Sequence, residues 1–206
     1  MFRPLLSLMT AATIILSAGA AQAQNGAEKY TFDKPHTQVI FSVNHLGFTN
    51  SYGRFLDYDG GFTLDRADLE KSSVEATIKV DSLDMGDGKW DEHLKSPDFF
   101  DAVKFPTMTF KSTSVKKTGE NTADITGDLT IHGVTKPVTF KTTHNKSGIL
   151  PMNDKVFVAG FTATTTIKRS DFGVDKGVPM VGDDVTIILE VQGNQVDYKG
   201  ADKGKE

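Results

Sequence analysis

The sequence predicts an all-β fold, an antiparallel up-and-down barrel of about eight strands with a short helical insert near residues 87–101. Apolar and polar residues alternate along most of the chain, which places successive side chains on opposite faces of strands. Turn sequences that contain Gly, Asn or Pro separate these stretches. The 206 residues include no cysteine, so sheet pairing and burial must stabilise the fold without disulfides. A closed barrel is favoured over a sandwich because closure removes exposed strand edges.

The chain begins with a pattern that is typical of a secretory signal peptide. Arg3 precedes a mostly apolar stretch from Leu5 to Leu16, and Ala21-Gln22-Ala23 forms a small-residue cleavage site. We therefore expect residues 1–23 to be cleaved after Ala23 and the protein to be exported. The remaining residues fit one domain over 24–195, followed by a polar tail over 196–206.

Charge and hydropathy narrow the classes of partner. Without Arg3 the chain carries 22 Lys and Arg against 27 Asp and Glu, a formal charge of −5, which is unfavourable for binding nucleic acid. After the signal, no segment approaches the roughly 18 uninterrupted apolar residues of a membrane span, so stable membrane insertion is not expected. The sequence leaves open whether the protein is a monomer or a homodimer.

The strands follow from alternation with a period of two residues. In the clearest example, Val74, Ala76, Ile78 and Val80 share one face while polar residues lie between them. The apolar faces predicted in chain order are Val39–Val43, Leu56–Leu64, Val74–Val80, Met108–Phe110, Ala123–Ile131, Val138–Phe140, Phe157–Ile167 and Val185–Val191. The predicted turns include Lys117–Asn121, His132–Gly133 and Asn145–Asn153.

One stretch, residues 87–101, breaks the strand pattern. Trp90 and Leu94 lie four residues apart, as on one face of a helix, and Ser96 before Pro97 resembles the cap of a second short helical turn. We expect a helical insert that closes one end of the barrel, with an ordered surface loop as the alternative.

Alternation alone does not decide whether the barrel is filled or hollow. Several predicted inward positions are small, which leaves volume between the large residues: Ala76, Ala123, Gly127, Ala159 and Ala163. The alternative is that side chains from the opposite wall fill this space, as in an ordinary core.

Four separated motifs, in order, resemble the YceI-like family, and the resemblance extends over residues 29–193. They are Tyr30–Asp33 with His36–Gly47 and Gly53–Phe55, then Trp90–Phe100 with Phe105–Pro106, then Gly127–Val138, and finally Arg169–Gly173. The resemblance implies a lipocalin-like extended barrel in the periplasm that encloses a long apolar molecule, such as a polyisoprenoid, an isoprenoid quinone or a fatty-acyl-like lipid. It also favours the hollow barrel.

The predicted ligand contacts fall into two groups. The expected lumen lining consists of Val39, Phe41, Val43, Leu56, Tyr58, Phe110, Ile125, Phe157, Phe161 and Ile187. His45, Arg54 and Arg169 share the parity of these apolar faces, and if they converge at one rim they could bind a polar or anionic head group. The alternative for either arginine is a structural salt bridge, for example to Asp171 or Asp57.

The residue patterns favour binding over catalysis. No histidine pair has metal-ligand spacing, and no nucleophile elbow, phosphate-binding loop or dinucleotide fingerprint is present, so neither a metal nor a cofactor is expected. The predicted function is transport, storage or sequestration of a lipid. The alternatives are an enzyme that acts on a bound isoprenoid or amide lipid with His45 as base, and a solid barrel without ligand.

Overall fold

The computed structural model describes residues 26–200, and the predicted signal peptide and residues 201–206 lie outside this range. Its strands are β1 (Glu28–Phe32), β2 (Gln38–His45), β3 (Thr49–Phe55), β4 (Tyr58–Leu64), β5 (Ser73–Lys79), β6 (Leu83–Asp84), β7 (Thr107–Lys117), β8 (Thr122–Ile131), β9 (Val134–Leu150), β10 (Asn153–Lys168) and β11 (Val181–Gln195). The helical elements are α1 (Gly88–Lys95) and the 3₁₀ turns η1 (Lys34–His36), η2 (Leu69–Lys71), η3 (Val80–Ser82) and η4 (Arg169–Phe172).

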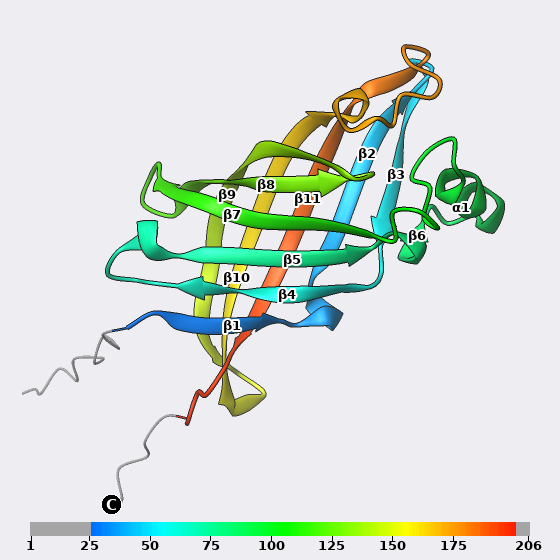
Figure 1. Ribbon diagram of the computed structural model, residues 1–206. Helices are drawn as coiled ribbons and strands as arrows, with labels where there is room; N and C mark the ends of the chain where they lie inside the picture. Colours follow the sequence, from blue (N-terminus) through cyan, green and yellow to red (C-terminus); the bar gives the residue numbers. More distant parts are fainter. Residues whose placement is uncertain (1–25, 201–206) are drawn as a thin grey trace, which may run out of the picture.

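Eight strands form a closed antiparallel ring, as the alternation predicts. The order around the ring is β1-β4-β5-β7-β8-β9-β10-β11, and β1 closes it by pairing with β11 through Tyr30↔Gln195 and Phe32↔Gly193. β2, β3 and β6 continue the sheet from the other half of β11 and form a tall side wall (Figure 1). Closure leaves every ring strand with two neighbours, so no edge of the ring is open to another chain.

A break at residues 56 and 57 separates β3 from β4. Inward-facing side chains stand at odd-numbered positions before the break and at even-numbered positions after it. Phe55 and Tyr58 are both buried, at 5% and 4% exposure, although they are an odd number of positions apart. At the break, the Leu56 amide donates to the Ser82 carbonyl, and the Asp57 carbonyl accepts from Lys79. The prediction of one continuous face from Leu56 to Leu64 is therefore wrong at Leu56, which points outward.

The predicted turns differ in outcome. His132 and Gly133 have φ angles of 51° and 74°, which form a tight turn between β8 and β9. The predicted turn over Asn145–Asn153 is wrong, because β9 and β10 continue through it and only Pro151 and Met152 connect them. The polar residues there lie on a hairpin that projects beyond the ring (Figure 1), so both of its faces are solvated along much of its length.

The helical insert is confirmed as α1, which begins at an Asp87 cap whose carboxylate accepts from the amides of Lys89 and Trp90. The predicted second helical turn is a hydrogen-bonded turn instead, in which the Phe99 amide donates to the Ser96 carbonyl. Leu94, Phe99 and Phe100 pack onto the barrel core, so the insert covers one end of the barrel as predicted.

Candidate functional site

The barrel encloses a cavity of about 550 Å³ whose wall is mostly apolar. This volume falls within the range of roughly 300–1,000 Å³ that is typical of small-molecule sites. Its wall comes from β2, β3, β4, β5 and β7–β11, and the apolar residues include Val39, Phe41, Val43, Phe55, Phe62, Val74, Ile78, Met108, Phe110, Ile125, Leu129, Phe140, Phe161, Ile187 and Leu189. The solid barrel considered above is therefore not the geometry of this chain.

Some of the small inward residues make room for rings rather than for a ligand. A Cβ at Gly127 would lie 2.5 Å from Cζ of Phe110, so that ring occupies the space which the glycine leaves. Ala163 and Ala76 lie on the cavity wall itself. The hollow interior therefore depends on only part of the small-residue pattern seen in the sequence.

Eight of the ten predicted lining residues lie on the cavity wall: Val39, Phe41, Val43, Tyr58, Phe110, Ile125, Phe161 and Ile187. Tyr58 also has a structural role, because its hydroxyl donates to backbone carbonyls of Lys34 and Thr37. The other seven are held by the ladders of β2, β7, β8, β10 and β11, so the strands fix their positions.

Leu56 and Phe157 do not line the cavity. Leu56 is 58% exposed because it lies at the break between β3 and β4. Phe157 has the inward parity of β10 but lies on the projecting hairpin, where its ring packs against Tyr198, with a centroid separation of 5.5 Å, and against the Arg66 guanidinium. Period-two counting places a side chain on a face, but it does not show where the cavity ends along that face.

The three predicted head-group residues do not form one rim. His45 is exposed at the end of β2. Arg54 lies opposite Ile40 on β2, five residues from His45, which places the two about 17 Å apart along the strand. Arg54 binds Asp84 at 2.7 Å and its side chain is 58% exposed, so the salt-bridge interpretation holds with a different partner from those predicted.

Arg169 lines the cavity but its donors are already used. It is 8% exposed, and its guanidinium donates to the carbonyls of Val174, Lys176, Val181 and Gly182 at 2.8–3.1 Å. Burial lowers its pKa from the ordinary value. Arg169 therefore stabilises the connection between η4 and β11 through these hydrogen bonds.

The end of the cavity near η4 is closed by apolar side chains. Phe172 and Val174 are 2% and 5% exposed, and both line the cavity beside Leu94, Phe99 and Phe100 from the insert. Phe100 meets Phe55 edge to face at a centroid distance of 5.8 Å. This end therefore presents hydrocarbon to a ligand.

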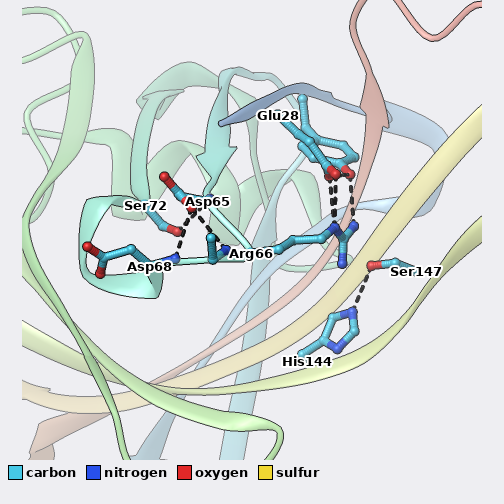
Figure 2. Close-up of polar contacts among 9 residues, drawn as sticks. Glu28, Asp65, Arg66, Asp68, Ser72, His144 and Ser147 are labelled. Carbon is cyan, nitrogen blue, oxygen red and sulfur yellow. Dashed lines mark hydrogen bonds and ion pairs between the residues drawn. The ribbon is translucent and has the colours of Figure 1, made fainter. Parts of the chain in front are cut away.

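The opposite end, which we call the mouth, holds most of the polar side chains of the lining. It is formed by the β4–β5 connection, the β7–β8 hairpin and the middle of β9, and its polar residues are Arg66, Ser72, Ser73, Lys117, Glu120, Asn121, Thr122 and His144. Figure 2 shows Arg66, His144 and Ser72 in this region. The amide of His144 donates to the Asn121 carbonyl at 2.8 Å, which brings β9 against the hairpin.

Arg66 and His144 lie at the mouth, and each is held by hydrogen bonds to neighbouring side chains. Arg66 donates from Nε to both carboxylate oxygens of Glu28 at 3.0 Å and from Nη2 to the Tyr30 hydroxyl at 3.2 Å (Figure 2). His144 contacts the Ser147 hydroxyl through Nε2 at 2.8 Å. Burial, and then the charge of Arg66, hold the pKa of His144 below its ordinary value. Burial and the hydrogen bond to Glu28 raise the pKa of Tyr30.

Sequence reasoning missed the mouth, although one signal was present. Val138, Phe140, Thr142 and His144 share one parity on β9, and the first three are buried. Extending the apolar face of Val138 and Phe140 by four residues would have found His144. Arg66 follows β4 in a polar connection, and nothing in its local pattern distinguishes it from a surface arginine.

Among residues 26–200, no group of three or more His, Cys, Asp or Glu side chains is arranged to hold a metal ion. Within the same residues, no helix is long and apolar enough to cross a membrane.

Comparisons with known proteins agree with the fold. A family model described as the YceI-like domain matches residues 30–193. A UPF0312 protein of Pseudomonas putida (strain W619) is 42% identical over 195 residues, which cover 94% of this chain and 98% of that protein. A UPF0312 protein of Ectopseudomonas mendocina (strain ymp) is 41% identical and covers 88% of this chain and 95% of its own length.

Solved structures give the same result. Burkholderia cenocepacia BcnA superposes with a TM-score of 0.71 at 28% identity, covering 78% of this chain and 98% of its own. The Campylobacter jejuni YCEI protein gives a TM-score of 0.68 at 33% identity, with coverages of 82% and 98%. A polyisoprenoid binding domain from Saccharophagus degradans shares the fold, with a TM-score of 0.63 at 14% identity and coverages of 81% and 98%.

Proposed function

Because the chain belongs to the YceI-like family, we propose that it is a binding protein that holds one long apolar lipid in the barrel lumen for transport, storage or sequestration. The observation that carries the proposal is the apolar cavity of about 550 Å³, closed by aromatic residues at one end and polar at the other. An amphipathic molecule with a long hydrocarbon tail matches this distribution.

The hydrophobic effect supplies the driving force. Each CH₂ group that leaves water contributes about 0.8 kcal/mol, so affinity increases with the length of tail that the cavity accepts. The cavity wall is already assembled from ladder-bound strand residues, so little ordering of the wall opposes binding. A short ligand would gain little from such a site. The domain from Saccharophagus degradans that shares this fold is described as polyisoprenoid binding, which supports an isoprenoid tail as the first ligand to test.

We also propose that the protein acts in the periplasm after removal of residues 1–23. The apolar stretch before Ala21-Gln22-Ala23 supports this placement. N-terminal sequencing of the protein from a periplasmic fraction should begin at Gln24, and an intact Met1 in a cytoplasmic fraction would contradict it.

Native extraction tests the binding function. The full chain is purified without detergent, extracted with organic solvent and examined by mass spectrometry beside an extract from cells that lack the protein. We expect a long-chain apolar molecule at a ratio near one per chain, and saturable binding of geranylgeraniol by the delipidated protein. If no such molecule co-purifies and no saturable binding is measured, the proposed function is wrong.

A further inference from the structure

Most of the polar side chains of the cavity wall lie at the mouth, and this indicates the end at which a head group would lie. The η4 end is lined by Phe172, Val174 and the aromatic residues of the insert. The only cation of that end, among the described lining residues, is Arg169, whose guanidinium is hydrogen bonded to four backbone carbonyls. A tail therefore points toward η4, and the head group lies at the mouth.

The charge of Arg66, which adds to burial in lowering the pKa of His144, is balanced by the protein itself. Both Glu28 oxygens accept from its Nε at 3.0 Å, and the Glu28 side chain is only 9% exposed. The Tyr30 hydroxyl accepts from Nη2 of Arg66 and donates to Glu28. Arg66 and Glu28 are therefore linked both directly and through Tyr30. The Phe157 ring lies 5.8 Å from the guanidinium carbon. An anionic ligand would have to compete with a preorganised carboxylate for this arginine.

The remaining charges of the mouth do not favour an anion either. Lys117 is the last residue of β7 and Glu120 lies in the turn before β8; both are exposed, so their formal charges cancel. His144 is neutral near pH 7, because burial and Arg66 both oppose its protonation. The mouth also offers uncharged hydrogen-bonding groups, namely the Ser72 hydroxyl and the Asn121 amide, whereas Nε2 of His144 is already hydrogen bonded to the Ser147 hydroxyl.

We propose that the mouth selects lipids with an uncharged polar head, such as an alcohol, a carbonyl or an amide, over lipids that carry a phosphate or a carboxylate. This inference rests on the proposed lipid-binding function and adds the class of head group. An uncharged head can hydrogen bond to the side chains of Ser72 and Asn121 without displacing Glu28 from Arg66. A phosphate would lose water while it faces a mouth in which Glu28 and Glu120 balance the charges of Arg66 and Lys117, and uncompensated burial of charge is costly.

Three probes with one tail test the inference: geranylgeraniol, geranylgeranyl monophosphate and geranylgeranyl diphosphate, each titrated into the delipidated full chain at pH 7. We expect the alcohol to bind about tenfold or more tightly than the monophosphate. In Glu28→Gln, which frees the Arg66 charge but keeps an acceptor, the ratio of monophosphate affinity to alcohol affinity should rise about tenfold. The matched control is Glu75→Gln, since Glu75 pairs with Lys111 on the outer wall at 2.7 Å, and there the ratio should stay as in the wild type.

Two kinds of failure are distinguishable. If the wild-type chain binds the monophosphate as tightly as the alcohol, or more tightly, the head-group inference is overturned while the binding function stands. If none of the three probes binds saturably, the proposed function itself fails. The wild-type comparison decides the inference even if Glu28→Gln does not fold, which its circular dichroism spectrum and thermal midpoint would show.

Discussion

Replacing Ala163 by Phe should block the cavity without damaging the fold. Ala163 is 8% exposed, lies on the cavity wall in β10, and pairs with Leu189 and Thr142 on the neighbouring strands. Because the cavity of about 550 Å³ lies in front of it, the new ring has room to enter the lumen. The variant therefore separates loss of ligand space from loss of structure.

The expected loss of affinity follows from the hydrocarbon that the ring displaces. Phe adds about six carbons, so a tail that withdraws an equal number of CH₂ groups would lose at most about 5 kcal/mol at about 0.8 kcal/mol each. A tail that withdraws only about two CH₂ groups still loses about 1.6 kcal/mol, which corresponds to more than about tenfold in affinity. We therefore expect weakening by a factor between about 10 and about 4,000.

The assay is fluorescence displacement of a long-chain probe by geranylgeraniol, combined with a thermal melt of the unliganded protein. Unfolding of the variant should occur at an equal or higher temperature, because a ring that enters a void gains burial without overpacking. Thr166→Phe is the matched control, since Thr166 lies on the same strand, is exposed, and faces Thr186 on the outside. Unchanged affinity in Ala163→Phe, or a melting temperature lowered by several degrees, would refute the hollow lumen at this position.

Three further predictions follow from the same geometry. Arg169→Met should lower the free energy of unfolding by about 3–5 kcal/mol in urea titrations, because four carbonyls lose their buried donor, and a loss below about 1 kcal/mol would contradict the stabilising role. Gly61→Ala should cost about 1–3 kcal/mol by the same measurement, because a Cβ there would lie 2.1 Å from the Tyr30 carbonyl oxygen, and an unchanged midpoint would show that β1 moves freely. The lowered pKa of His144 means that the unfolded chain binds its proton more readily, so stability should fall as pH drops below about 6.5, the ordinary value for imidazole. That fall should be smaller in His144→Gln when urea midpoints at pH 5 and pH 8 are compared, and an equal fall in both proteins would count against it.

The ring could be predicted from the sequence because each strand carries its own alternating pattern, and the insert because Trp90 and Leu94 repeat with a helical period. The break at Leu56 could not, since it depends on hydrogen bonds with Ser82 and Lys79, which are distant in sequence. The alternating pattern correctly predicted that Arg169 faces inward. Only the fold shows that its guanidinium donates to backbone carbonyls. The charge of Arg66 at the mouth is balanced by Glu28, which lies 38 residues away in the sequence. A local sequence pattern could not have predicted this pair.

The pairing of β1 with β11 also determines when the barrel can close during synthesis. Every other pairing around the ring joins residues at most 36 positions apart (Glu28 with Leu64), but this one joins residues near 30 to residues near 195. During synthesis the ring therefore stays an open, curved sheet until the last strand has emerged. Until then the apolar concave face of this sheet is exposed to water. A ribosome-stalled or C-terminally truncated chain that lacks Val181–Gln195 would leave β1, β2 and β10 each with an unpaired edge, and would be the form most exposed to aggregation.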